Sequence, residues 1–229
     1  MLTSMTPPPS PASRRERPAK PALTKEGIID AAMAIVTDPD GPSLTLRRLA
    51  ERLDTGPASL YVYIRNITEL NALLLDRLLA DLDTAWPPSE PWRPRLHRAL
   101  LDYSVLLARY PALARTALLV WPDGPSYLDL LELLMRLLEE AGVDDAVAVR
   151  SVDLLLQLAT ASAVEWSGRS QADGQDLDDL GATLAAADSA RHPTLVRVGA
   201  DAFVSGEPDE RHGWVIDALL DGILAARRP

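Results

Sequence analysis

The sequence of 229 residues has no cysteine, only three histidines, one phenylalanine and two lysines. The lack of cysteine excludes disulfide bridges, thiol nucleophiles and cysteine metal sites. The histidines, His97, His192 and His212, show neither HExxH spacing nor a plausible metal-ligand partner four residues on, so no zinc site is recognisable. The glycine-rich phosphate loops of nucleotide-binding proteins are absent as well. We therefore expect a protein that is not an enzyme and needs neither a metal nor another cofactor.

Long uncharged segments are also missing. After the proline-rich start, the longest one, 154–164, has eleven residues, well short of the roughly 20 that span a bilayer. The amino-terminal MLTSMTPPPS lacks the apolar segment of a signal peptide. These features predict a soluble, cytoplasmic protein that does not bind membranes.

Charge is divided unevenly along the chain. Residues 1–70 contain nine Lys/Arg and eight Asp/Glu, whereas 71–229 contain fourteen and twenty-five, a net charge of −11. Double-stranded DNA would be attracted to the first part and repelled by the second, because Lys and Arg neutralise phosphates. The alternative is a solvated basic tail in front of an ordinary acidic domain. The basic residues of 1–22 raise a separate question. They either enter a minor groove of the DNA or form a disordered tail that makes no contact with it.

Apolar residues recur at three- and four-residue steps from Leu23 onward, which predicts an all-α fold. We expect a disordered arm over 1–22, which holds six prolines, a three-helix domain over 23–66 and a larger helical domain over 67–229. In the first domain and at its border, the predicted helices cover 24–37, 45–53, 57–64 and 66–82. Further helices are predicted near 93–108, 111–120, 126–141, 144–167, 177–190, 194–203 and 209–227.

The short helix predicted over 57–64 is the most informative one. Leu60 and Ile64 lie four residues apart and should face the small core, which leaves Tyr61 and Tyr63 on the outside. Two outward tyrosines suit a surface that lies against a sugar-phosphate backbone. The alternative is that Tyr61 belongs to the core and only Tyr63 is exposed.

The residues TLRRLAERL at 45–53, followed by a turn, LYVYIRN at 60–66 and Glu69-Leu70, closely resemble the DNA-binding segment of the TetR family of bacterial regulators. The resemblance covers about 23–82 and implies a helix-turn-helix domain followed by a ligand-binding and dimerisation domain. It further implies a repressor that binds a palindromic operator as a homodimer and is released by a small-molecule ligand. The DNA contacts that it implies are Thr45, Arg47, Pro57, Ala58, Ser59, Tyr61, Tyr63 and Asn66.

Three positions depart from the family pattern. Asp54 stands in the turn where glycine is common, and aspartate tolerates left-handed backbone better than most residues. Tyr63 replaces a common histidine or phenylalanine, and Ile67 stands where lysine is usual, so one phosphate contact is expected to be lost. The base-reading positions are small and mostly apolar, which favours methyl contacts and shape readout. Asp54 and Ile67 keep open an alternative, a helical protein-interaction module with degenerate DNA binding.

A narrow polar stripe marks the helix predicted over 144–167. Asp153, Gln157 and Thr160 follow one another at i, i+4 and i+7 on an otherwise apolar helix, and buried polar groups need partners. Those partners are either a ligand or another helix. The family resemblance implies a small-molecule pocket, to which aromatic and thioether side chains on neighbouring helices would contribute, although each of these also fits a plain core. The predicted ligand contacts are Tyr103, Trp121, Met135, Gln157 and Thr160.

The last predicted helix carries a stripe of small residues, Ala218, Gly222 and Ala225, at i, i+4 and i+7. Small side chains let two helices approach closely, and larger neighbours supply contact area. We expect this face to pack with 144–167 and with its own copy as a four-helix dimer interface. The predicted interface comprises Trp214, Ala218, Leu219, Gly222, Ile223 and Ala225.

Overall fold

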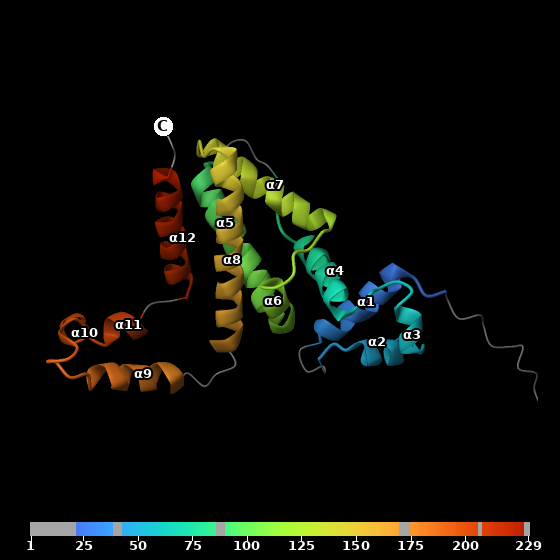
Figure 1. The fold of residues 1–229 in the computed structure, drawn as a ribbon, viewed down its shortest axis with the longest axis horizontal. Coiled ribbons are helices and arrows are strands. Elements are labelled where there is room, and N and C mark those ends of the chain that lie inside the picture. The colour runs from blue at the N-terminus through green and yellow to red at the C-terminus, as the bar shows by residue number, and fades with distance from the viewer. Residues whose placement is uncertain (1–21, 39–42, 86–89, 170–174, 206–207, 227–229) are drawn as a thin grey trace, which may run out of the picture.

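A computed structural model describes residues 22–38, 43–85, 90–169, 175–205 and 208–226. Within these ranges the chain forms twelve helices and no strand (Figure 1). The predicted all-α fold is confirmed. Nearly all of the arm predicted over 1–22 lies outside the described residues.

The amino-terminal head consists of α1 (Lys25–Val36), α2 (Leu46–Arg52) and α3 (Pro57–Leu60). Thr24 caps α1, because its hydroxyl accepts a hydrogen bond from the Gly27 N–H at 3.0 Å. Thr45 caps α2 in the same way, with the Arg48 N–H at 3.2 Å. Such caps satisfy backbone donors that a helix leaves unpaired in its first turn. The head closes around a small apolar core formed by Ile28, Ala32, Leu49, Ala50, Leu60 and Ile64.

The third helix is shorter than predicted. It ends at Leu60, and the chain continues as a turn in which the N–H groups of Tyr63 and Ile64 both bond to the Leu60 carbonyl, at 2.9 and 3.0 Å. The aromatic and β-branched residues of 61–64 have lower helix propensity than unbranched ones, which fits the early end.

Helix α4 (Ile67–Leu79) joins the head to the larger helical body. Asn66 caps it by accepting the Glu69 N–H at 2.8 Å. The Glu69 carboxylate in turn accepts the Arg65 N–H at 2.6 Å, one residue earlier than in a standard capping box.

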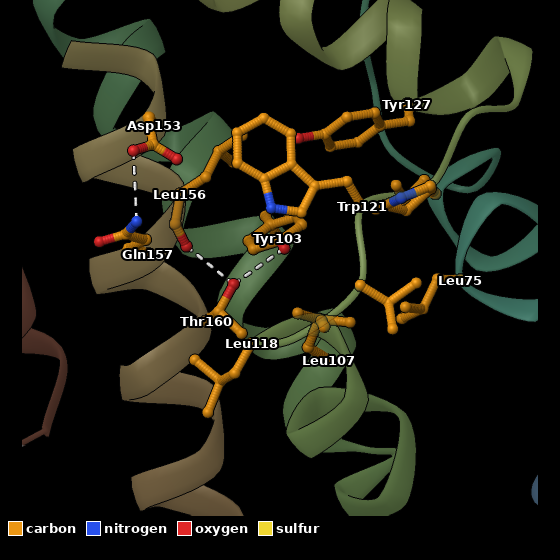
Figure 2. Close-up of a pocket in the computed structure, with 14 residues that line it drawn as sticks. Leu75, Tyr103, Leu107, Leu118, Trp121, Tyr127, Asp153, Leu156, Gln157 and Thr160 are labelled. Atoms are coloured by element: carbon orange, nitrogen blue, oxygen red, sulfur yellow. Dashed lines mark hydrogen bonds between the residues drawn. The ribbon is translucent and has the colours of Figure 1, made fainter. Parts of the chain in front are cut away.

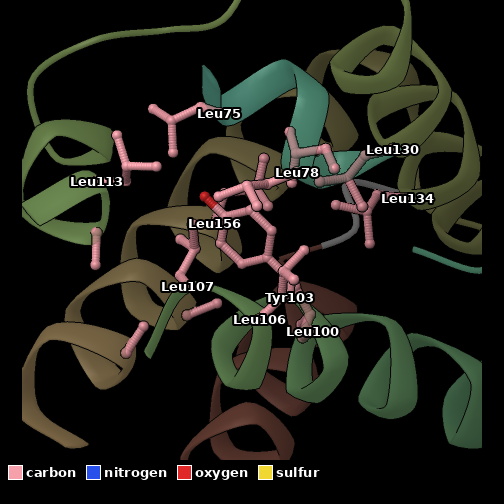
Figure 3. Packing of buried hydrophobic residues seen from close by; sticks show 14 of the residues in the cluster. Leu75, Leu78, Leu100, Tyr103, Leu106, Leu107, Leu113, Leu130, Leu134 and Leu156 are labelled. Atoms are coloured by element: carbon pink, nitrogen blue, oxygen red, sulfur yellow. The ribbon is translucent and has the colours of Figure 1, made fainter. Parts of the chain in front are cut away.

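The body is built around α8 (Asp145–Arg169), which contacts α5 (Trp92–Ala108), α6 (Pro111–Ala117) and α7 (Pro125–Glu140). Their shared core is rich in leucine, and Figure 3 shows Tyr103 of α5 among the leucines of the neighbouring helices. The face of α8 that packs against Tyr103 therefore lies at the centre of the body.

The carboxyl-terminal part comprises α9 (Gln175–Ala185), α10 (Pro193–Val198), α11 (Asp201–Val204) and α12 (Pro208–Ala225). The first three pack on one another beyond one end of α8, whereas α12 runs beside α8 and also contacts α5 (Figure 1). The prediction of a single helix over 194–203 is wrong. Gly199, with φ of 87°, turns the chain there and separates α10 from α11.

One helix within the described ranges, 145–168 of α8, is long and apolar enough to cross a membrane, with a mean hydropathy of 1.4. The search for charge-free segments does not reveal this helix, because Arg150, Asp153 and Glu165 divide the apolar stretch. A core helix of a globular domain has the same composition, and α8 packs against four other helices. Only 44% of this stretch is buried within the protomer, so α8 also presents a face outward.

Candidate functional site

The exposed surface of the head contains the residues predicted to contact DNA. Seven of the eight are exposed, and Ser59 is partly buried. Leu60 and Ile64 are 0% and 2% exposed, so the turn that joins them holds the tyrosines outward, Tyr61 at 57% and Tyr63 at 36%. The alternative in which Tyr61 belongs to the core is therefore wrong.

Between the two tyrosines lies Val62, which is 78% exposed and was not among the predicted contacts. An exposed valine on such a turn is available for contact with a thymine methyl group. Ile67, by contrast, is partly buried and packs against the core. The residue that replaces the family's usual lysine thus supports the junction between head and body.

Among the described residues, the ion-pair partner of Arg47 in the head is Glu51, and this pair is highly exposed. The Arg47 Nε lies 3.0 Å from the Glu51 Oε1, and the two side chains are 86% and 63% exposed. An ion pair this exposed contributes little to stability. The Arg47 guanidinium is therefore available to exchange its partner for a phosphate.

In the body, a cavity of about 60 Å³ lies between α5, α8 and the segment that joins α6 to α7 (Figure 2). Four of the five predicted ligand contacts, Tyr103, Trp121, Gln157 and Thr160, line it together. The remaining lining residues are Leu75, Leu79, Leu107, Ala117, Leu118, Val120, Pro122, Tyr127, Asp153 and Leu156.

Met135, the fifth predicted contact, is not among the residues that line this cavity. It is partly buried on α7 and packs against the hydrophobic core. The residue of α7 that does reach the cavity is Tyr127, in the first turn of the helix. The choice of Met135 for this cavity is corrected accordingly.

The polar stripe of α8 finds two kinds of partner. The Thr160 hydroxyl donates to the Leu156 carbonyl at 2.7 Å and accepts from the Tyr103 hydroxyl of α5 at 2.9 Å. Burial raises the pKa of Tyr103 to about 12. One turn away, the Gln157 amide donates to the Asp153 carboxylate at 3.2 Å. Thr160 is thus satisfied by another helix, whereas Asp153 and Gln157 bond to each other at the cavity wall.

Aromatic rings enter the cavity from three different elements. Figure 2 shows the Trp121 indole reaching toward α8, with Tyr103 and Tyr127 beside it. Trp121 is 68% exposed, and Leu118 and Leu119 before it are 47% and 84% exposed. Burial, and secondarily the charge of Asp153, raise the pKa of Tyr127. Both Tyr127 and Asp153 were absent from the predicted contacts, and for Tyr127 no local pattern in the sequence indicates the cavity.

The wall of the cavity is tied to α4. The Tyr127 N–H donates to the Asp76 Oδ1 at 2.9 Å, and Gly124, the residue before α7, supplies no side-chain cap of its own. A Cβ on Gly124 would lie 2.1 Å from the Asp76 carboxyl group, so only glycine permits this approach. The helix that carries the head is therefore anchored to the end of segment 118–124, which lines the cavity.

The face predicted to form a dimer lies on α12 next to α8. Trp214 is 72% exposed, and the small residues Ala218, Gly222 and Ala225 are exposed as well. Leu219 is partly buried. Ile223, at 8% exposure, is mainly a core residue of the protomer. A surface groove of about 460 Å³ runs between the helices, lined by Val147, Arg150, Ser151, Leu154, Ala218, Leu219, Gly222, Ile223 and Ala226.

Another side of α12 is fixed to α5 by charges. Arg93 bonds to Asp217 and to Asp221, each at 2.6 Å, and the His97 Nε2 lies 3.0 Å from the same Asp217 oxygen. Burial opposes ionisation of Asp217, but the hydrogen bonds from His97 and Arg93 outweigh it and lower the pKa of that carboxyl group. This attachment leaves the small-residue face of α12 uncovered in the protomer.

Residues 86–227 match the family described as "Tetracyclin repressor-like, C-terminal domain". The chain belongs to the TetR family. Among curated relatives, it is 28% identical over 229 residues to the HTH-type transcriptional repressor DrrR1 of Streptomyces coeruleorubidus, covering 94% of this chain and 83% of that protein. It is also 28% identical over 208 residues to the tetracycline repressor protein class A from transposon 1721 of Escherichia coli, covering 90% and 92%.

Among solved TetR-family structures, that of Streptomyces coelicolor ActR in complex with actinorhodin superposes with a TM-score of 0.81. Sequence identity is 30%, and the match covers 91% of this chain and 100% of that one. The resemblance inferred from the helix-turn-helix segment is thereby confirmed. TetR-family proteins are transcription regulators, a class of DNA-binding proteins and not of enzymes.

Proposed function

We propose that this chain is a repressor that binds a palindromic operator as a homodimer and releases it when a small molecule enters the cavity of the body. The observation that carries the DNA-binding part is the outward turn of Tyr61, Val62 and Tyr63, anchored by buried Leu60 and Ile64. Two repressors among its relatives, DrrR1 and the class A tetracycline repressor, support the direction of regulation.

On DNA, the three-helix head of 23–66 would place Pro57, Ala58 and Ser59 in the major groove. The phenols of Tyr61 and Tyr63 donate hydrogen bonds to phosphates, and Arg47 adds a charge. The amino end of α4, next to Asn66, provides a positive helix end for a further phosphate. The repressor acts in the cytoplasm, where the operator lies.

Homodimerisation would bring two copies of α8 and α12 together around a twofold axis. The apolar residues that α8 leaves exposed, such as Leu154 at 43%, and the small residues of α12 form one continuous surface along the groove. Burying this surface against a copy explains its composition without a membrane. Each head then reads one half of a palindrome.

The structural change caused by ligand binding would be transmitted to the head through α4. The cavity of about 60 Å³ is far smaller than the roughly 300 Å³ or more of typical ligand sites, so an effector must displace the exposed segment that contains Trp121. That segment ends at Gly124, which lies against Asp76 of α4, and α4 packs against α1. An effector that binds the displaced arrangement better thereby shifts the position of the heads.

The test is binding to DNA that flanks the protein's own gene, measured by fluorescence anisotropy over a series of salt concentrations. Arg47→Ala should weaken binding and reduce the slope of log K against log[salt] by about 1, because one phosphate contact is lost. Arg136→Ala is the matched control, since Arg136 is also exposed and also pairs with a glutamate four residues away, but on α7. If no flanking DNA binds in a salt-dependent manner, the protein-interaction module is the better description.

A further inference from the structure

The cavity wall carries one carboxylate and, among the described residues that line it, no Lys, Arg or His. The Asp153 carboxylate accepts a hydrogen bond from the Gln157 amide at 3.2 Å, and no ion pair among the described residues includes it. An amide orients a carboxylate but does not neutralise its charge. The cavity therefore has a negative charge that a cation would compensate.

The surroundings strengthen this preference. The part of the chain that contains the body, 71–229, has a net charge of −11, so its long-range field attracts cations and repels anions. The charge of Asp153 also contributes to the raised pKa of Tyr127, which places the carboxylate within electrostatic reach of the aromatic ring on the opposite wall.

The aromatic side chains define the shape of the occupant. Trp121 and Tyr127 both line the cavity, and Trp121 remains 68% exposed. Such rings bind flat aromatic molecules by stacking and bind cations through the negative face of the ring. Leu118, Leu107 and Leu156 supply apolar surface around them.

We propose that the effector is a planar aromatic organic cation, with Asp153 as its counter-ion. Its rings stack against Trp121 and Tyr127, and its protonated amine lies near the Asp153 carboxylate, which Gln157 holds in place. The inference rests on the proposed function, because it names the chemical class of the effector for the same cavity. A neutral or anionic effector would leave the Asp153 charge in the occupied cavity without a counter-ion.

The test is direct binding of dyes to the purified full-length chain in the absence of DNA. Rhodamine 123, ethidium and berberine serve as planar cations of different size, and fluorescein serves as the anion that shares the ring system of rhodamine. Dye anisotropy should show saturable binding of at least one cation, and fluorescein should bind roughly a hundredfold more weakly. Asp153→Asn should reduce the affinity for the cation about tenfold or more and leave fluorescein no worse.

Asp129→Asn is the matched control, because it removes the same charge from an exposed position on α7 and should leave dye affinity unchanged. Asp153→Glu keeps the charge and should keep the preference for cations, which guards against misfolding of the asparagine variant. The inference is overturned if fluorescein binds as well as the cations, if no cation binds, or if Asp153→Asn leaves cation affinity unchanged.

Release of DNA is measured separately, so that the two proposals fail independently. Asp153-dependent cation binding without release contradicts the release mechanism and retains the ligand class. Release by a neutral or anionic molecule that binds the cavity contradicts the ligand class and retains the mechanism.

Discussion

At the scale of single residues, the backbone of Asp54 is the most constrained in the head. Its φ of 48° is the only positive value at a non-glycine residue in the described part of the chain. Asp54 lies in the turn between α2 and α3, so this conformation sets the direction in which α3 leaves α2. The left-handed geometry expected from the glycine common at this position is confirmed, and aspartate adopts it at modest cost.

Replacing Asp54 by valine should lower the free energy of unfolding by about 1–2 kcal/mol, because a β-branched residue clashes in the left-handed region. Asp54→Gly should be at least as stable as the parent. Urea unfolding followed by circular dichroism measures both. Equal stability of the valine and glycine variants would show that the turn is not strained.

A second residue-scale prediction concerns His212, which is only 5% exposed. Its Nδ1 lies 3.2 Å from the Ser162 hydroxyl, and its ring makes an edge contact with Trp166 at 5.1 Å between centroids. Burial, and to a lesser extent the charge of His97, lower the pKa of His212 below its ordinary value of 6.5. The folded protein therefore keeps this histidine neutral at pH values where the unfolded chain takes up a proton.

The pKa of His212 is lower in the folded protein than in the unfolded chain, so protonation favours unfolding. The free energy of unfolding is therefore at its full value above pH 6.5 and decreases as the pH falls from there through the folded pKa. The urea midpoint should decrease over this range, and His212→Gln should flatten the decrease. His192→Gln, on the loop before α10, serves as the control. Glu69, Glu90 and Asp217, whose pKa values are lowered from 4.5, 4.5 and 3.8, contribute stability above those values and lose it only as the pH falls further. An unchanged profile in His212→Gln would contradict the assignment.

At the scale of elements, α7 depends on a cap from another helix. Asp76 of α4 accepts the Tyr127 N–H and places a carboxylate at the positive end of α7. The two residues are 51 positions apart in the chain, so no local motif reveals the contact. The same contact connects the helix bearing the head with a helix that lines the cavity.

Asp76→Ala should lower the free energy of unfolding by about 0.5–2 kcal/mol, the usual cost of losing a helix cap. It should also weaken the release of DNA by an effector more than it weakens DNA binding itself. Asp81→Ala is the control, because Asp81 is exposed just beyond the end of α4. Unfolding and effector titrations of the DNA complex give the two readouts, and normal release in Asp76→Ala would exclude this path.

At the scale of the whole molecule, α12 has two unequal sides. Arg93 and its aspartates fasten one side to α5, and the opposite side exposes Ala218, Gly222 and Ala225. Apart from the adjacent residues and the backbone of its own helix, no heavy atom of the described residues lies within 4 Å of the position that a Cβ would take on Gly222. A side chain at this position should therefore disturb assembly and not the folding of the protomer.

Gly222→Glu should raise the dissociation constant of the homodimer at least about a hundredfold, because the added side chain would hold the two helices apart and bring a charge into the interface. Gly213→Glu makes the same change on the same helix, outside the small-residue stripe, and a Cβ there also meets no described side chain within 4 Å. Analytical ultracentrifugation at micromolar concentration should show a dimer for the control and a species of 24.9 kDa for Gly222→Glu. A wild-type chain that sediments only as the 24.9 kDa species would contradict the dimer itself.

The features of this chain that can be read from its residues alone are local. The helix starts predicted at 24, 45 and 66 depend on neighbours within about one helical turn, and the structure shows caps there. The inward positions Leu60 and Ile64 depend on equally close neighbours and are confirmed. The packing of helices far apart in the chain places Tyr127 and Asp153 at a cavity that Met135 does not line, and brings Asp76 to the start of α7. Periodicity shows which face of a helix is buried, but not how far that helix slides or rotates against the next, and this relative placement determines which distant residues meet.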